Sequence, residues 1–292
     1  MFKFHDTKQE QRNLLEKAGD LLKPDEDRKD SGWGLCLGGG AAAGMAHICF
    51  LEVLDTFDIR PREIAGTSIG AVIGAFYAAG MKAGEIRRIF ADLSNLFEFG
   101  KLVDFKFFNK FGLLAGKNIE RRLRTLLQDA TFADLKTKLR VVATEFWTGE
   151  QVVFESGPIH KALRASISIP GIFVPVTDGD RILVDGASSN PLPFDLLSRD
   201  CGITLAVDVT GERTRDAKSE MPTIAEAIVS TIQIQQERLV DHILEDRQPT
   251  LYIKPDIHGV RFMEFNKFKE VEEQVRPEVE ALRNWLNEKV GS

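Results

Sequence analysis

The sequence predicts an α/β fold in a single domain. Near the start, the apolar run 33–37 leads through a glycine-rich loop into a helical pattern, and the run at 63–67 leads through a sharp turn into a second one. Further short apolar runs follow, separated by amphipathic stretches. The 292 residues are 43% hydrophobic, which is enough for one large core, and no stretch resembles a flexible linker between modules.

Composition excludes several classes of protein. The net charge of -6 and the pI near 5.5 argue against nucleic acid as a partner, since phosphate binding needs a concentrated basic surface. The odd number of cysteines and their position in apolar runs predict buried thiols in a reducing compartment; they are Cys36, Cys49 and Cys201. We expect a cytoplasmic protein, because the N-terminus is too charged for a signal peptide and no run reaches the roughly 18 apolar residues of a membrane span.

The first 30 residues differ from the rest of the chain. Residues 7–22 have apolar positions at helical spacing, and a charged run to Asp30 follows. This pattern predicts an amphipathic leader helix and linker at 1–30, ahead of a main domain at 31–292. The helix would suit packing on the body, a homodimer or peripheral contact with a membrane, although its mixed charges weaken the last option.

The glycine-rich loop that follows the first strand, Trp33–Leu37, has the pattern of an anion-binding site. The loop glycines let backbone approach a ligand, and free N–H groups at the start of the helix over 45–57 would face negative charge. We interpret the loop as an oxyanion hole that would stabilise the negative oxygen formed when a nucleophile attacks a carbonyl; its residues are Gly38, Gly39, Gly40 and Ala41. His47, within the helix, is expected to be a packed residue.

The same loop also fits a second interpretation. Gly38, Gly40 and Ala43 match a loose dinucleotide-binding fingerprint. Such a site needs an acidic residue at the end of a second strand about 20 residues on, whereas Asp55 and Asp58 fall at a helix end and in a turn. The oxyanion hole is therefore favoured.

The run Gly66-Thr67-Ser68-Ile69-Gly70 is the centre of the second unit. In a Gly-x-Ser-x-Gly elbow the two glycines permit a strained turn between strand and helix, so that the serine hydroxyl stands exposed at the helix N-terminus. That position suits a nucleophile. In the alternative, Ser68 only caps the helix that ends near Gly80.

A phenylalanine-rich segment follows a helix expected over 83–93. Its irregular pattern and its lysines would suit a lid, an acyl-chain channel or a membrane contact, or the rings simply cover the core or a dimer interface. The seven phenylalanines are Phe90, Phe97, Phe99, Phe105, Phe107, Phe108 and Phe111. A helix over 118–127 comes next.

The second half of the chain supplies a candidate acid. The sequence predicts strands at 138–146 and 150–154 joined as a hairpin, a short helix through Ala165, and a strand at 181–184 that delivers Asp185-Gly186-Ala187. An acid at the end of a strand lies where open α/β sheets build their sites, although Asp-Gly is also a turn dipeptide. The remaining expected elements are a strand at 203–208, a helix at 223–244, a strand at 250–253 and a single amphipathic helix at 267–290.

With these motifs present in this order, the chain resembles the patatin-like phospholipases. The resemblance runs from about Trp33 to Pro255; besides the loop, the elbow and Asp185-Gly186-Ala187, it includes the stretches 142–144, 156–171 and 190–193. It implies a three-layer α/β/α sandwich with a mostly parallel sheet, related to the α/β-hydrolases. It also implies hydrolysis of lipid acyl esters by a serine–aspartate dyad, with Ser68 as nucleophile and Asp185 as base and no cofactor or metal.

Two residues depart from the family pattern. The loop in the family usually ends Gly-Gly-Gly-Ala-Arg-Gly, and alignment on Gly44 places Ala41 at the last of the three glycines and Ala43 at the arginine. The change removes a positive charge beside the oxyanion loop, and a Cβ at residue 41 hinders a left-handed backbone if one is needed there. We therefore expect a slow hydrolase, or one tuned to a tolerant substrate.

Two other functions stay open at this point. A Ser-His-Asp esterase would use Ser68, Asp185 and either His242 or His258. A catalytically weak lipid-binding or scaffolding protein would keep the fold and lose the chemistry. No His/Cys cluster has metal-ligand spacing, so no metal is expected.

Overall fold

The computed structural model describes residues 32–98, 114–210, 221, 224–261 and 263–290. The leader and residues 99–113 of the phenylalanine-rich segment lie outside them. The strands are β1 (Trp33–Leu37), β2 (Glu63–Thr67), β3 (Lys138–Glu145), β4 (Gln151–Phe154), β5 (Val176–Asp178), β6 (Arg181–Asp185), β7 (Ile203–Val207) and β8 (Leu251–Ile253). The α-helices are α2 (Ala46–Thr56), α3 (Ile69–Ala78), α4 (Ala83–Glu98), α5 (Lys117–Leu126), α6 (Ile159–Ser166), α7 (Ile224–Asp246), α8 (Phe268–Gln274) and α9 (Arg276–Val290).

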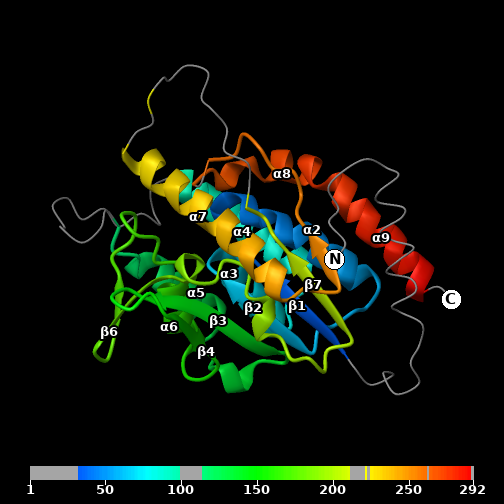
Figure 1. Ribbon diagram of the computed structural model, residues 1–292, viewed down its shortest axis with the longest axis horizontal. Helices are drawn as coiled ribbons and strands as arrows, with labels where there is room; N and C mark the ends of the chain where they lie inside the picture. The colour runs from blue at the N-terminus through cyan, green and yellow to red at the C-terminus, as the bar shows by residue number, and fades with distance from the viewer. Residues whose placement is uncertain (1–31, 99–113, 211–220, 222–223, 262, 291–292) are drawn as a thin grey trace.

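The strands form one mixed sheet at the centre of the molecule (Figure 1). Its order is β5-β6-β3-β2-β1-β7-β8, and β4 also pairs with β3. The pairs from β3 to β8 along this path are parallel, whereas β4, β5 and β6 are antiparallel additions on one side. The mostly parallel sheet is confirmed, and β5 is a strand that the sequence did not predict.

Helices cover both faces of this sheet. In β1, Leu35 and Leu37 join the large core cluster formed with α2, α3, α6 and α9. Cys36, between them, faces the opposite layer, where it packs in a cluster that includes Phe194 and Val240 of α7. Because both faces are buried, the strand is apolar throughout instead of alternating. The three cysteines are buried free thiols, as predicted.

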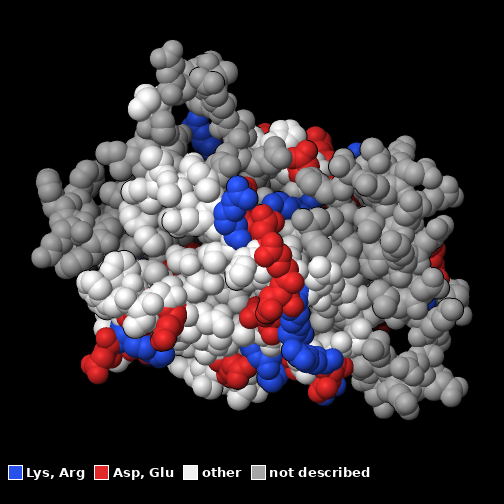
Figure 2. Space-filling view, in the orientation of Figure 1, with Lys and Arg blue, Asp and Glu red and all other residues white. Residues whose placement is uncertain are grey.

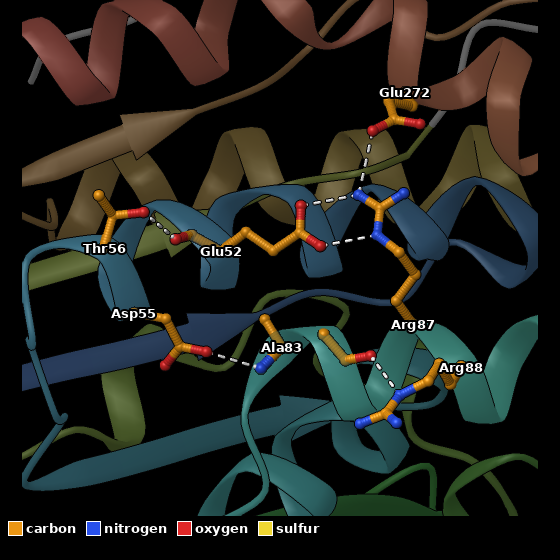
Figure 3. A network of polar contacts seen from close by, with 8 residues as sticks. Glu52, Asp55, Thr56, Ala83, Arg87, Arg88 and Glu272 are labelled. Carbon is orange, nitrogen blue, oxygen red and sulfur yellow. Dashed lines mark hydrogen bonds and ion pairs between the residues drawn. The ribbon is translucent and has the colours of Figure 1, made fainter.

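Polar contacts join three helices on one side of the sheet (Figure 3). Arg87 of α4 donates to both carboxylate oxygens of Glu52 on α2, at 2.6 and 2.7 Å, and to Glu272 of α8 at 3.0 Å. Asp55, at the end of α2, accepts a 2.7 Å bond from the amide of Ala83 at the start of α4. Asp55 therefore has a structural role in fastening α4 to α2.

The C-terminal segment differs from its prediction. The single helix expected over 267–290 is wrong: α8 ends at Gln274 and α9 begins at Arg276, with a turn at Val275 between them. Pro277 explains the break, because its ring removes a backbone donor and clashes with the carbonyl four residues earlier. No helix in the described ranges combines the length and the apolar character needed to cross a membrane.

Candidate active site

Two strands on either side of β3 bring the predicted nucleophile and acid together. Thr67 of β2 pairs with Val142, and Asp185 of β6 pairs with Ala143, so both strands reach the same level of β3. Ser68 follows Thr67 directly. Its Oγ donates a 2.7 Å hydrogen bond to Oδ2 of Asp185, across 117 residues of sequence.

The backbone around Ser68 explains the two glycines of its motif. Ser68 has φ 54° and ψ -124°, a strained conformation for a residue with a side chain. A Cβ at Gly70 would lie 2.1 Å from the carbonyl oxygen of Leu37, and one at Gly66 would lie 2.8 Å from the backbone of Ala71. Only glycine fits at either position, and the serine is thereby fixed at the start of α3.

Asp185 is buried and held on both oxygens. Oδ2 accepts from Ser68, and Oδ1 accepts a 2.8 Å bond from the amide of Ala187. Gly186 lets its backbone pack closely against β3, since a Cβ there would lie 2.2 Å from the carbonyl oxygen of Val142. Burial raises the pKa of Asp185 from its ordinary 3.8 to about 6, although the two hydrogen bonds act in the opposite direction.

A segment at the end of α6 supports both residues of the pair. The Oγ of Ser166 accepts a 2.8 Å bond from the amide of Ser68, and the carbonyl of Ser168 accepts a 3.0 Å bond from the amide of Asp185. Arg164, itself buried, donates to Oγ of Ser168 at 2.6 Å. The sequence reasoning missed this role, and its one signal was the stretch 156–171 within the family resemblance.

The glycine loop offers fewer amide donors than its sequence suggests. The amide of Gly38 donates to Val207 at 3.0 Å, and that of Gly39 donates to Pro191 at 2.9 Å. The amides of Gly40 and Ala41 have no acceptor among the described residues. Two of the four predicted donors are therefore committed to the fold, and two are free to meet a ligand.

Ala41 adopts the conformation that its Cβ disfavours. Its φ is 49°, in the left-handed region where glycine has no steric penalty. Ala43 is buried in the main core cluster. The departure from the family pattern at residue 41 thus carries a local backbone cost.

His47 packs beneath the glycine loop and contacts its backbone. Its Nε2 lies 2.9 Å from the carbonyl oxygen of Gly38, and its buried Nδ1 has no partner in the described part of the chain. Burial lowers the pKa of His47 to about 4, so the ring is neutral at physiological pH. A neutral ring that donates from Nε2 satisfies this geometry, and the prediction of a packed histidine is confirmed.

Ser68 lies where two cavities meet. The larger, of about 100 Å³, has an almost wholly apolar lining that includes the serine; besides Ala41 and Ser68, its lining consists of Ile69, Val72, Phe90, Ile119, Leu123, Ile167, Ile169, Phe173, Met263 and Phe265. The smaller, of about 40 Å³, reaches Asp185 and is bounded by Gln233 and Gln236 of α7. Phe90 is the one member of the phenylalanine-rich segment that the structure places at this site.

The geometry argues against the Ser-His-Asp and the dinucleotide-binding interpretations. His242 and His258 have exposed side chains, each beside an acidic residue, Glu245 and Asp256 respectively. Because Ser68 bonds directly to Asp185, no imidazole stands between them. The dinucleotide interpretation lacks its acidic residue, since Asp55 is engaged by the amide of Ala83 and the hydroxyl of Tyr77.

Comparison with known proteins places this chain in a family. A family model described as patatin-like phospholipase matches residues 35–198. An uncharacterised NTE family protein of Mycobacterium tuberculosis is 31% identical over 191 residues, which are 65% of this chain and 52% of that protein. The lysophospholipase NTE1 of Candida glabrata is 25% identical over 266 residues, which are 82% of this chain and 15% of that protein.

Two solved structures are similar at lower sequence identity. VipD from Legionella pneumophila aligns with 86% of this chain and 67% of its own at a TM-score of 0.47 and 13% identity. The type III effector ExoU of Pseudomonas aeruginosa aligns with 87% of this chain and 53% of its own at a TM-score of 0.44 and 18% identity. The chain spans about half or less of the length of the curated relatives named above. Since the family model covers more than half of its residues, the chain belongs to the patatin-like phospholipase family.

Proposed function

We propose that this protein hydrolyses lipid acyl esters with a Ser68–Asp185 dyad. The observation that carries the proposal is the 2.7 Å hydrogen bond from the Ser68 hydroxyl to a buried carboxylate, beside an apolar cavity that Ser68 lines. A strained elbow, a paired base and an apolar recess together are what an enzyme needs to attack an ester that carries a hydrocarbon chain. We propose a cytoplasmic location for this activity.

The reaction has two halves. Asp185 takes the Ser68 proton as Oγ forms a bond to the ester carbonyl carbon, and the C–O bond to the alcohol then breaks as that proton passes to the leaving oxygen. Water next loses a proton to Asp185 and attacks the acyl-enzyme. Breaking the Ser68 ester bond returns the proton to Oγ and releases the fatty acid.

The free amides of Gly40 and Ala41 are the proposed oxyanion donors. Of the four predicted donors, they are the two with no acceptor among the described residues, and both residues line the cavity that Ser68 and Asp185 also line. Loss of one such donor typically costs about 100-fold to 1000-fold in rate. Because only two of the four predicted amides are available, stabilisation of the transition state depends strongly on each of them.

The environment of Asp185 makes it a stronger base than an exposed aspartate. A pKa of about 6 lies closer to neutral pH than the ordinary value, which favours transfer of the serine proton while the carboxylate remains ionised at pH 7. No histidine is needed for this step. The similarity to a lysophospholipase supports phospholipids or lysophospholipids as the substrate class.

Hydrolysis of a soluble short-chain p-nitrophenyl ester tests the proposal. We expect turnover by the wild type and a fall of at least about 1000-fold in both Ser68→Ala and Asp185→Asn, with His242→Ala and His258→Ala within twofold of the wild type. Activity that survives in Asp185→Asn, or that is lost in His242→Ala, would contradict the dyad. A wild type without turnover on any ester would favour a lipid-binding role, which the strained Ala41 supports.

A further inference from the structure

Large hydrophobic side chains are exposed at few places in the described residues. These are Phe146, Trp147, Met221, Ile228 and Ile234, with 38% to 78% of each exposed. Phe146 and Trp147 form the tip of the β3–β4 hairpin, where their rings stack edge to face with centroids 4.9 Å apart. Exposed tryptophan beside exposed phenylalanine costs solvation free energy, so the pair calls for a function.

The amide groups of the hairpin turn are hydrogen-bonded within the protein. The carboxylate of Glu145 accepts from the amides of Trp147 and Thr148, at 2.8 and 2.7 Å. The carbonyl of Glu145 accepts from Gly149 at 3.0 Å, and its amide donates to Glu150 at 2.9 Å. Leaving an amide unpaired in hydrocarbon costs several kcal/mol of free energy, about as much as losing a hydrogen bond there. The turn can therefore lie at a lipid surface without leaving these amides unpaired.

The hairpin projects from the edge of the sheet that holds the active site. Ala143 pairs with Asp185, and β3 ends two residues further on at Glu145. Phe146 follows in the turn, three residues from Ala143, which is about 10 Å at the ordinary rise of a strand. Thr144, two residues before Phe146, bonds to the backbone of Asp185 and to Ser189. The aromatic tip thus stands beyond Asp185.

The first half of α7 carries the other exposed hydrophobic residues beside the site. The side chain of Ile228 lies over Gly171, next to Pro170 at the smaller cavity, and Ile234 borders a groove shared with Ala187. Glu226 is the one charged residue in the sequence from 224 to 236, whereas charges follow closely from Glu237 onward. Figure 2 shows this as an uncharged area bounded by a charged stripe along the second half of α7.

We propose that Phe146, Trp147, Ile228 and Ile234 form a docking rim that inserts into the surface of the lipid aggregate holding the substrate. The inference rests on the proposed function, because it places the lipid aggregate that contains the substrate against the cavity beside Ser68. Tryptophan prefers the boundary between headgroups and acyl chains, where its ring is half apolar and its N–H is wet.

Charge around the rim favours a zwitterionic lipid surface. The exposed acidic residue Glu150 and the carboxylate of Glu145 flank the aromatic tip, and the chain as a whole carries a net charge of -6. An anionic membrane would repel such a surface, whereas neutral headgroups leave the apolar contacts to act. We therefore assign the rim to phosphatidylcholine-like surfaces.

Binding to phosphatidylcholine vesicles, measured with the full chain carrying Ser68→Ala so that no lipid is consumed, tests the rim. Trp147 should report insertion directly, because Trp285 is buried and Trp33 packs edge to face against it. We expect a blue shift of tryptophan emission with vesicles and co-sedimentation of the protein. Adding Trp147→Phe should abolish the shift and retain sedimentation, and the double change Phe146→Ala and Trp147→Ala should weaken sedimentation at least about tenfold.

Three outcomes would overturn the rim. They are unchanged vesicle binding in the double variant, binding restricted to anionic vesicles and lost at high salt, and a dimer of the wild type in light scattering that the double variant loses. Hydrolysis of the soluble ester separates this proposal from the proposed function. In the wild-type Ser68 background the double variant should match the wild type on that ester within twofold, whereas failure of the wild type on it would count against the hydrolase alone.

Discussion

The elbow at residues 66–70 and the glycine loop at 38–44 both face the reacting centre, yet they are constrained differently. In the elbow, a Cβ at Gly70 would meet the carbonyl oxygen of Leu37 at 2.1 Å, and backbone cannot yield. In the loop, a Cβ at Gly39 would meet the side chain of Ala187 at 3.2 Å, and Ala41 already carries a Cβ at φ 49°.

The difference teaches how each half of the site is specified. The elbow is fixed by sterics, so glycine is the only residue that works and the motif is visible in the sequence. The loop is specified by which amides have acceptors: those of Gly38 and Gly39 do, and those of Gly40 and Ala41 do not. At residues 39 and 41 the side chain can change while the function of the backbone remains, whereas a Cβ at Gly40 would lie 2.7 Å from the carbonyl oxygen of Val209.

The largest effect expected from this comparison is on folding. Gly70→Ala should lower the free energy of unfolding by more than about 4 kcal/mol or prevent folding, because nothing near Leu37 can move aside. Gly39→Ala, its counterpart in the loop, should cost less than about 2 kcal/mol. Urea denaturation of both variants gives the comparison, and equal costs would remove the distinction between the two regions.

Ser166 extends the constraint on the elbow to a side chain. Ser166→Ala leaves the buried amide of Ser68 without its acceptor, so the strained serine loses a support. We expect kcat to fall about 10-fold to 100-fold with KM nearly unchanged. Ser189→Ala, which removes a nearby hydroxyl bonded to Thr144 instead, should stay within twofold. Equal losses in the two variants would mean that Ser166 only fills space.

The loop should make stability depend on pH through His47. Its pKa is about 4 in the folded protein and about 6.5 when unfolded, so the stability it supports is present above pH 6.5 and is lost as pH falls toward 4. His47→Gln keeps a donor for Gly38. Between pH 7 and pH 4 the wild type should lose about 3 kcal/mol more than this variant, at 1.36 kcal/mol per pKa unit. Parallel pH profiles would refute the assignment.

Asp185 makes stability depend on pH in the opposite direction to His47. Because its pKa is raised in the folded protein, its contribution to stability is present below pH 3.8 and is lost as pH rises through about 6. Both His47→Gln and the wild type retain this residue, so the difference between them isolates the histidine.

The smallest effect concerns Ala41. Ala41→Gly should raise the free energy of unfolding by up to about 1 kcal/mol, since glycine carries no penalty at φ 49°. Ala42→Gly, at a buried neighbouring residue with no positive φ, should lower it by about 0.5–1 kcal/mol. Thermal unfolding of the pair measures the two signs, and the same sign in both would show that the loop is not strained at residue 41.

Sequence reasoning located what sterics dictate. The strand, elbow and helix around Ser68 and the strand that ends at Asp185 were all predicted, because glycines and apolar runs leave a local record. The role of Ser166 and the use of the Gly38 amide were not, since each depends on which acceptor the tertiary fold brings near. The break at Val275 was missed although Pro277 marks it, because the amphipathic pattern continues on both sides.

Covalent labelling by a fluorophosphonate tests the central claim most directly. The account predicts one label per chain, on Ser68 by peptide mass spectrometry, at a rate that rises with pH through a midpoint near 6 as Asp185 ionises. Labelling should be lost in Asp185→Asn and kept in His242→Ala. A label on another residue, or a rate on Ser68 that Asp185→Asn leaves unchanged, would contradict the dyad.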